Sequence, residues 1–498
     1  MQKVAASSTV NRFKALDIVR GLAIIGMVFS SMLPSTLPAW MFHARTPPPS
    51  MKFDPTIMGI TWVDLVLPFF LFSLGAAIPF ALKKRVVKNG VVMTIFNIIT
   101  RFLLLAFFAV FLPQIDNLSW GNAGVTCTQI LTIIGFAMMF GFFVRLPKES
   151  RFVKWQLIIN IVGFAGVVLL LASKGLFDAK AFSWSKQNII LMILANTYLL
   201  TGLSWLFTRE NIPMRFLVLI GLVALRFSSE HSGWVADGIQ ALNTTNHTTF
   251  LGDLINISLM QFSHIAIMGS IAGEYILCYL AGKTIENDGV VSGKDSAPWA
   301  NWRYWGSAFI SLAYVVFTCY ALFINRDMEL FVCVLASVVL LTLLMHKPHT
   351  ALEVLIRRFA LTGWILILVG LLFGPANDGV HKDSPSTIGY LYCSAGLAFF
   401  AILLMAILTE KFKIEKGLRL LQANGQNPMI AYVIGRHLLW PILIMIPIGQ
   451  SNLNESITNG LSSIFGMTAG LLLVAVLKTL AVMLSVAYFT KHRYYWRT

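Results

Sequence analysis

The stretch "GITWVDLVLPFFLFSLGAAIPFAL" (residues 59–82) decides the fold of this 498-residue chain. It is longer than the roughly 20 apolar residues that one helix needs to cross a membrane, and Asp64 is its one charged residue. The whole chain is 57% hydrophobic and 12% charged, with a mean hydropathy of +0.74. Soluble domains carry about 25% charged residues. The sequence therefore predicts an all-α polytopic integral membrane protein.

Similar apolar runs recur along the chain and predict a helical bundle of about 14 transmembrane spans, within a range of about 11–14. Membranes retain Lys and Arg on the cytoplasmic side, and most of the 38 in this chain fall on one side when the N-terminus is placed inside. Both termini are therefore expected to be cytoplasmic. The predicted spans are 16–33, 58–82, 91–113, 125–144, 156–172, 188–207, 214–226, 258–282, 304–324, 328–345, 359–374, 389–409, 425–446 and 463–490.

The net charge of +16 needs no nucleic-acid partner to explain it. We interpret the basic runs "KKRVVK" (83–88) and "KFKIEK" (411–416) as solvated cytoplasmic loops that face anionic lipid. The polar segment 283–303 is predicted to be a cytoplasmic connector. It would divide the chain into an eight-span part (1–282), which holds His43 in an outer loop, and a six-span part (304–498).

The sequence argues against several kinds of site and chemistry. The five cysteines lie in apolar runs without a CxxC spacing, so neither a disulfide framework nor a zinc site is expected. We find no Walker lysine loop and no GxGxxG after a strand, which argues against ATP-driven transport and dinucleotide chemistry. No metal cofactor is therefore predicted.

Ionisable residues inside predicted spans are costly and become candidates for a site. In "LDIVRG" (16–21), Asp17 and Arg20 lie three apart and can pair; Arg20 either completes a structural ion pair or faces an anionic ligand from the cytoplasm. Asp64 lies too deep to be a free surface charge. Its partner is either His43, in the preceding outer loop, or a cation packed elsewhere.

Two later motifs also place polar residues in the bundle. The "GSIAG" of 269–273 is interpreted as a close helix contact. In "GQNPMIAYVIGRHL" (425–438), Asn427 is expected near the inner mouth. Arg436 and His437 would lie near mid-depth, where they require an acid or an anion as partner.

Five motifs, in order along the chain, resemble one known family. They are "RFKALDIVRGLAIIGMVF" (12–29), the 59–82 stretch, "MGSIAGEYI" (268–276), "HKDSPSTIGYLYCSAGLA" (381–398) and "GQNPMIAYV" (425–433). Together with a His-bearing loop between the first two, they resemble the lysosomal heparan-alpha-glucosaminide N-acetyltransferase family and its bacterial homologues.

This resemblance implies a transmembrane acetyltransferase that moves acetyl from cytoplasmic acetyl-CoA to a glucosamine-type amine on the outer side. The family's active-site histidine falls on His43, and we expect Asp64 to orient it. Acetyl-CoA is the expected co-substrate, and a bacterial inner (plasma) membrane is the expected location. The expected partners are a small-molecule or glycan acceptor and membrane lipid, and a homodimer is left open. The remaining site predictions are Arg20, Arg101 and Asn427 for acetyl-CoA, and Lys382 and Arg436 for the acceptor.

The role of His43 can be stated chemically. An imidazole with an unperturbed pKa near 6.5 suits removal of a proton from an amine near neutral pH. His43 would deprotonate the acceptor for direct attack on the thioester, or attack the thioester itself and carry the acetyl group. Two alternatives stay open: a transporter for amino sugars or their acetylated forms, and an O-acetyltransferase acting on a cell-surface glycan.

Overall fold

The protein is described here by a computed structural model, which covers residues 12–116, 120–121, 123–177, 182–184, 186–209, 211–246, 254–282, 297–374, 379–382 and 386–497. Within these ranges helices dominate, and the four strands have two residues each. Twelve of the described helices are long and apolar enough to cross a membrane. The predicted all-α polytopic membrane fold is confirmed.

The helices of the first part are α1 (Lys14–Ser30), α2 (Trp62–Phe111), α3 (Val125–Phe143), α4 (Gln156–Ala172), α5 (Ile189–Thr208), α6 (Ile212–Glu230), α7 (Trp234–Asn246), α9 (Ile257–Met260) and α10 (Ser263–Leu280). Those of the second part are α11 (Asn301–Phe323), α12 (Asp327–Leu344), α13 (Ala351–Phe373), α14 (Ile388–Ala406), α15 (Arg419–Gln426), α16 (Pro428–Ile434), α17 (Trp440–Met445), α18 (Leu453–Phe465) and α19 (Met467–Lys491).

Short turns and strands complete the description. Two π-helical turns are η7 (Ile407–Lys411) and η9 (Gly435–Leu439). The 3₁₀ turns are η1 (Ala39–Met41), η2 (Leu112–Gln114), η4 (Val153–Trp155), η5 (Ser173–Phe177) and η8 (Lys416–Leu418). Antiparallel pairs join β1 (Val144–Arg145) to β4 (Tyr495–Trp496) and β2 (Pro447–Ile448) to β3 (Ser451–Asn452).

Each predicted span falls on a helix, but the division into helices differs from the prediction. One membrane-length helix, Trp62–Gln114, holds two predicted spans, and α1, with 17 residues, is shorter than the twelve. The interpretation of "KKRVVK" as a loop is wrong, because α2 continues through these residues. Lys, Arg and Val can all continue a helix, and the chain turns only at Gly90, whose φ of 77° a side chain would disfavour.

The last two predicted spans are also interrupted. The run 425–446 is broken at Asn427 and again at the π-helical turn η9. The run predicted from 463 begins instead at Met467, because Gly466 (φ 85°) reverses the chain between α18 and α19. The run "KFKIEK" leaves the helix as predicted and connects α14 to α15.

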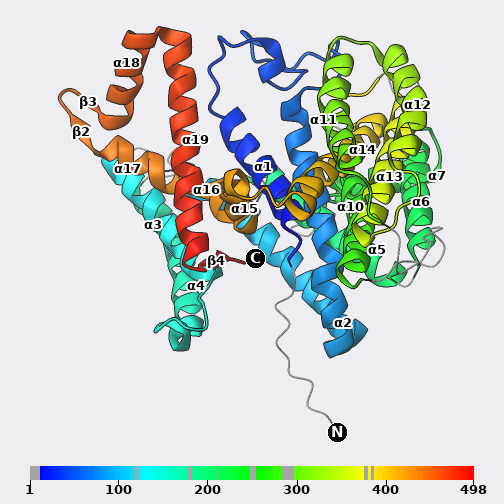
Figure 1. The fold of residues 1–498 in the computed structure, drawn as a ribbon. Coiled ribbons are helices and arrows are strands. Elements are labelled where there is room, and N and C mark those ends of the chain that lie inside the picture. The colour runs from blue at the N-terminus through cyan, green and yellow to red at the C-terminus, as the bar shows by residue number, and fades with distance from the viewer. Residues whose placement is uncertain are drawn as a thin grey trace.

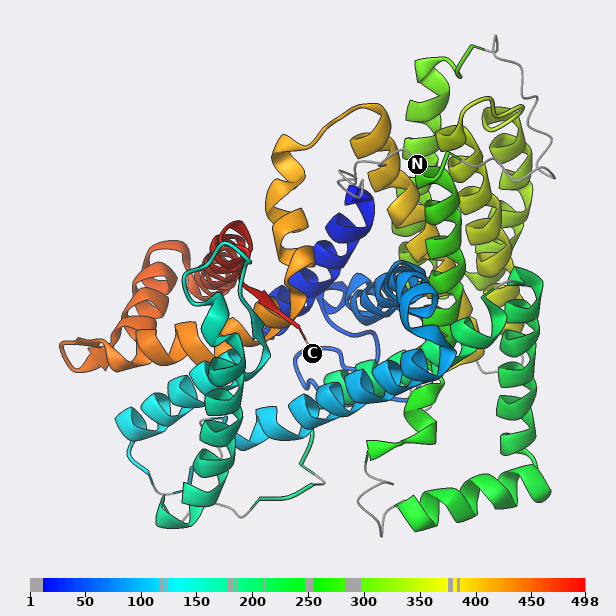
Figure 2. The same cartoon turned by 90° about the horizontal axis from the view of Figure 1, so that it is seen from below.

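Helix α1 lies at the centre of the bundle, between α15, α16 and α19 on one side and α2 and α14 on the other (Figures 1 and 2). Helix α10 packs closely on α2, as the "GSIAG" motif predicted. A Cβ added to Gly269 would lie 2.2 Å from the Phe72 carbonyl oxygen, and one added to Gly273 would lie 2.3 Å from that of Ala76. The two glycines therefore allow the two backbones to touch.

The predicted division into eight-span and six-span parts stays a prediction. Residues 283–296 of the connector lie outside the described residues. Helix α14 of the second part packs against α1, α2 and α10 of the first. The two parts therefore share one core.

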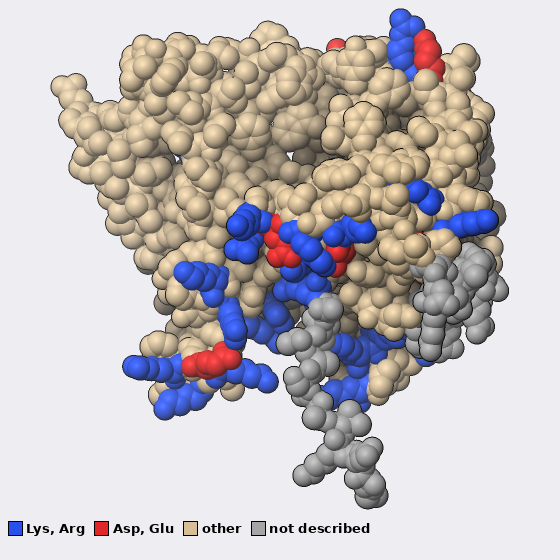
Figure 3. All heavy atoms as spheres, viewed as in Figure 1, with Lys and Arg blue, Asp and Glu red and all other residues tan. Residues whose placement is uncertain are grey.

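Charged side chains are distributed unevenly between the two ends of the bundle. In Figure 3, Lys and Arg gather over the lower half of the view, around the lower ends of α2 and α4, while the upper half is mostly uncharged. We call the lower end, which carries Lys83, Arg85, Arg145 and Arg497, the basic face; the upper end, with the loop of residues 31–61, is the opposite face. By the rule that cations are retained inside, we expect the basic face to lie on the cytoplasmic side.

Candidate functional site

The predicted contact between His43 and Asp64 is present. His43 Nδ1 lies 2.6 Å from Asp64 Oδ1, although the two residues belong to a loop and to the first turn of α2. The His43 side chain is 44% exposed, whereas that of Asp64 is 3% exposed. A buried carboxylate therefore holds an imidazole that reaches the surface at the opposite face.

Four donors satisfy the Asp64 carboxylate. Besides His43, Oδ2 accepts from the backbone N–H groups of Thr61 (3.0 Å) and Ala44 (3.1 Å) and from the Thr61 hydroxyl (3.3 Å). A carboxylate removed from water needs such partners. Because the same group caps α2 and accepts from the backbone N–H of Ala44, the residue after His43, it fixes the imidazole relative to the helix.

The first turn of α14 and the loop before it also reach this pair. The Tyr390 hydroxyl donates to the Asp64 backbone carbonyl at 2.7 Å. Burial lowers the pKa of the Lys382 ammonium from its ordinary 10.5, and the negative charge of Asp64 partly opposes that change. The structure thus brings Lys382, a predicted acceptor residue, into the electrostatic surroundings of the predicted catalytic pair.

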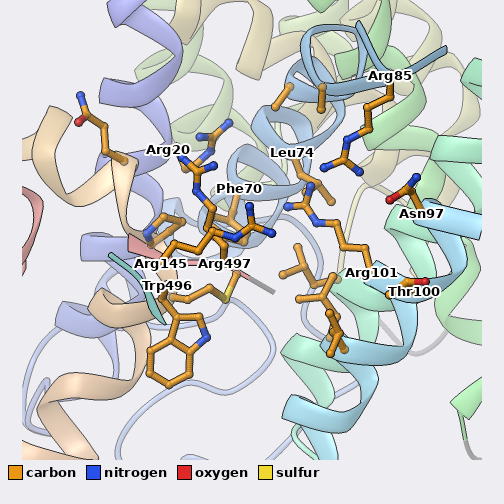
Figure 4. A pocket seen from close by; sticks show the side chains of 18 residues that line it. Arg20, Phe70, Leu74, Arg85, Asn97, Thr100, Arg101, Arg145, Trp496 and Arg497 are labelled. Carbon is orange, nitrogen blue, oxygen red and sulfur yellow. The ribbon is translucent and has the colours of Figure 1, made fainter. Parts of the chain in front are cut away.

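A second feature is a cavity of about 520 Å³ that opens at the basic face. Five arginines line it, and no carboxylate belongs to its lining: Arg20, Arg85, Arg101, Arg145 and Arg497. Figure 4 shows Arg20, Arg101, Arg145 and Arg497 around one shared space, with Arg85 farther out. We call it the arginine cavity.

Few of these cations have an acid to balance them. Arg20 donates to the Ser73 carbonyl at 2.9 Å and lies 3.6 Å from Asp17, which confirms the predicted Asp17–Arg20 pair. Arg101 stacks on the Tyr198 ring at 4.6 Å. Among the described residues, Arg85, Arg101, Arg145 and Arg497 form no ion pair with a carboxylate. Such a set of guanidinium groups is suited to bind phosphate groups.

Two of the five arginines reach the cavity through a long-range strand pair. β1 pairs with β4 in the register Arg145–Tyr495, and the Arg497 N–H donates to the Phe143 carbonyl at 3.1 Å. Partial burial and the positive charge of Arg145 lower the pKa of Arg497 from its ordinary 12.5. A lowered pKa of this kind indicates that the two cations repel each other and that a bound anion would relieve the repulsion.

Asn427 has a different place from the one predicted. It is buried, its amide donates to the Tyr494 carbonyl at 2.7 Å, and its oxygen accepts from the Trp496 N–H at 3.1 Å. It lies behind the cavity wall and does not line it. The reason is that the chain breaks at Asn427, which turns the side chain toward the β4 segment. Asn427 therefore positions Trp496, and with it Arg497.

A third feature is a cavity of about 450 Å³ toward the opposite face, which we call the outer cavity. Its wall holds Arg436, which was predicted to bind the acceptor, and Asp116, with which Arg436 forms an ion pair. Asn188 and Tyr432 also line it and hydrogen bond to each other at 2.9 Å. Arg436 thus has the acidic partner that the sequence required without identifying it.

The arginine cavity and the outer cavity lie one above the other along the same helices. Four segments contribute a residue to each of the two linings, and these two residues are three to seven positions apart, or about 5–10 Å at 1.5 Å per residue. The pairs, basic-face member first, are Arg20 and Met27, Leu105 and Leu112, Leu194 and Ile190, and Met429 and Tyr432.

Sequence reasoning missed three residues of these sites. Arg145 and Arg497 stand at the ends of apolar runs on the basic face, and that position was the available signal. Asp116 lies in a short outer loop without a motif. The structure places Arg20 and Arg101 together in one cavity, Arg436 in a second, and His43 with Asp64 at the opposite face.

Two comparisons with known proteins can be set beside this geometry. A comparison with curated proteins finds no match. Residues 12–276, more than half of the chain, match the family described as a domain of unknown function (DUF5009). This region contains the His43–Asp64 pair and four of the five cavity arginines, Arg20, Arg85, Arg101 and Arg145. The chain therefore belongs to the DUF5009 family, whose function is unknown.

Proposed function

We propose that this protein transfers an acetyl group from cytoplasmic acetyl-CoA to the amine of a glucosamine-type acceptor on the other side of a bacterial inner membrane. The observation that carries the proposal is the arginine cavity, which lies on the same helix as Asp64. Five residues of the first half of α2, before the turn at Gly90, line it at positions that fall on one helix face: Phe70, Leu74, Ala77, Ala81 and Arg85.

The length of this face matches a ligand that extends across the membrane. Along α2, Phe70 lies roughly 9 Å below Asp64, and Arg85 roughly 32 Å below it, at 1.5 Å per residue. Guanidinium groups line the cavity along this face, from Arg20, which donates to the Ser73 carbonyl beside Leu74, to Arg85 near the basic face. A long anionic ligand fits a wall of this length and charge.

The residues present fit acetyl-CoA as co-substrate. Arg20, Arg101, Arg145 and Arg497 would hold its phosphates, since planar guanidinium groups bind phosphate oxygens in pairs. The thioester supplies an activated acetyl group. The apolar part of the wall, such as Phe70 and Leu74, would exclude water from the less polar arm.

The hydrogen bond to Asp64 defines which nitrogen of His43 can act. With Nδ1–H donated to the carboxylate, the neutral imidazole has its lone pair on Nε2. Nε2 would take the proton from the acceptor's ammonium group, and Asp64 would stabilise the imidazolium that forms. Alternatively, Nε2 would attack the thioester carbonyl, the C–S bond would break with release of the CoA thiol, and the imidazole would then pass the acetyl group to the amine. Both routes require the exposed ring that His43 presents.

One observation favours a competing function. The predicted span 425–446 is interrupted at Asn427 and at the π-helical turn η9, and broken helices at mid-membrane are common in transporters. A transporter for amino sugars would use the two stacked cavities as a path for the sugar. It would need no cluster of arginines, because an amino sugar is cationic.

Titration calorimetry of the protein in nanodiscs with CoA and with pantetheine tests the proposal. We expect CoA to bind, and its affinity to fall as salt is added, because screening weakens contacts between guanidinium groups and phosphates. Pantetheine, which lacks the nucleotide phosphates, should bind more weakly and with less dependence on salt. Absence of CoA binding by folded protein would favour the transporter.

A further inference from the structure

The outer cavity contains polar groups that the proposed transfer reaction has not used. Asn188 and Tyr432 exchange hydrogen bonds, with the amide donating at 2.9 Å and the hydroxyl donating back to the amide oxygen at 3.1 Å. Gln187, also in the wall, has a side-chain oxygen that is buried and has no hydrogen-bond partner among the described residues. A buried acceptor without a partner is costly, and a ligand hydroxyl would satisfy it.

The π-helical turn η9 shapes the other wall of this cavity. A π-helical turn inserts an extra residue into a helix and is frequent at functional sites. Here it contains Arg436 and His437, both of which line the cavity. The Arg436 side chain is 62% exposed, whereas that of its partner Asp116 is 16% exposed. The carboxylate is thus the fixed member of the pair, and the guanidinium is free to move aside.

The chemistry of this wall selects among ligands. It combines one carboxylate, one mobile cation, two side-chain amides and the aromatic rings of Tyr432 and Trp440. Sugars bind to such sites through hydroxyls that meet amides and through apolar faces that meet aromatic rings. A volume of about 450 Å³ is within the range of about 300–1,000 Å³ typical for small-molecule sites.

We propose that the outer cavity binds the amino-sugar acceptor before transfer, with the ammonium group beside Asp116 and the hydroxyls at Asn188, Tyr432 and Gln187; the amine then leaves Asp116 for His43 to react. The ammonium displaces the exposed Arg436 from Asp116. This assignment rests on the proposed function. It places the acceptor about 5–10 Å beyond the arginine cavity along the shared helices, next to Met32, where the loop of His43 begins.

Direct binding of two probes in the absence of acetyl-CoA tests this assignment. The probes are methyl glucosaminide, which is cationic, and methyl N-acetylglucosaminide, which is neutral. Asp116→Asn should weaken binding of the cationic probe about tenfold or more and affect the neutral probe less, because a hydrogen bond to a charged group is worth about 1.5–3 kcal/mol. A merely structural role for Asp116 would weaken both probes equally.

A second variant guards against misfolding. Tyr432→Phe removes one hydroxyl and should weaken both probes about fivefold, whereas Tyr488→Phe, at an exposed position of α19, should change neither. Unchanged binding in both Asp116→Asn and Tyr432→Phe would overturn the assignment. So would a protein that binds CoA but neither sugar, and this result would leave acetyl transfer to another acceptor standing. Sugar binding without CoA binding would instead support the cavity assignment and overturn the proposed transfer.

Discussion

Two buried carboxylates, Asp64 on α2 and Glu274 on α10, each contact a basic side chain. The two basic partners differ in their exposure to solvent. Asp64 binds His43, whose side chain is 44% exposed. Glu274 lies 3.8 Å from Arg215, whose side chain is 0% exposed, and accepts from the Trp205 indole at 2.7 Å. Arg215 also donates to the Thr208 hydroxyl at 3.1 Å.

The difference separates a candidate for chemistry from a structural contact. The Glu274–Arg215 pair ties α10 to α6 in the interior, with partners from α5 as well. Its charges are surrounded by protein, so no substrate reaches them. The His43–Asp64 pair keeps its carboxylate in the protein and presents its ring outside. An ionisable residue in an apolar helix is therefore a functional candidate when its partner is accessible.

The largest expected effect is on activity at the accessible pair. His43→Ala should lower acetyl transfer to a glucosamine-type acceptor by about 10²–10⁴-fold, the usual contribution of a general base. Expression and CoA binding should change little, because the loop residue adds little to helix packing. Asp64→Asn should cost less, and the two losses should not add, since the residues act as one unit. Full turnover by His43→Ala would remove the distinction between the two pairs.

At the enclosed pair the expected effect is on stability. Arg215→Met leaves Glu274 buried without its cation, which typically costs about 3–5 kcal/mol of folding free energy. Arg326→Met is a matched control, because Arg326 pairs with Glu329 at an exposed site where such pairs contribute about 0–1 kcal/mol. Equilibrium unfolding in mixed micelles measures both. Equal stability of the two variants would show that Arg215 is not a structural contact.

The comparison extends to the arginine cavity, where four of the five arginines form no ion pair with a carboxylate of the described residues. Arg101→Ala should weaken CoA binding about tenfold and reduce its dependence on salt, since one phosphate contact is lost. Folding should be affected less than by Arg215→Met. Arg326→Ala removes an equal charge far from the cavity and is the control in calorimetry. A loss of affinity that is the same for both variants would mean that only net charge matters.

The smallest expected effect is a change in one pKa. The negative charge of Asp64 raises the pKa of Lys382 against the lowering caused by burial. Removing that charge in Asp64→Asn should therefore lower the pKa of Lys382 further, so that the amine becomes reactive at lower pH. Labelling with an amine reagent across pH, followed by mass spectrometry, measures this. Glu274→Gln should leave the Lys382 pKa unchanged, and an equal change in both variants would contradict the assigned proximity.

The sequence predicted the positions of the helices, which follow from hydrophobicity, and the contacts between residues that are close along the chain. The apolar runs located the helices, because a span needs about 20 apolar residues whatever its neighbours are. Asp17 and Arg20 pair because their spacing places them on one helix face. The contact of Asp64 with His43 was also within reach, since a short loop of fixed length connects them.

The features that the sequence did not predict depend mostly on contacts between segments that are distant along the chain. The two-residue strands that bring Arg497 to Arg145 have no periodicity from which they could be predicted. The Asn-Pro pair at 427–428 is a local signal for the helix break, but the hydrogen bonds of Asn427 to Tyr494 and Trp496 join distant segments and could not be predicted. Lysines after an apolar run indicated a loop at 83–88, but the helix ended only where Gly90 allowed a positive φ.

Acetyl transfer across a sealed membrane tests the central claim most directly. Vesicles would contain the purified protein in known orientation and glucosamine inside, with labelled acetyl-CoA added to the side that the basic face contacts. The account predicts labelled N-acetylglucosamine within the vesicles, no product when acetyl-CoA is supplied only on the opposite face, and no product with His43→Ala. Unmodified glucosamine leaving the vesicles while no acetylated sugar forms would contradict it and identify a transporter.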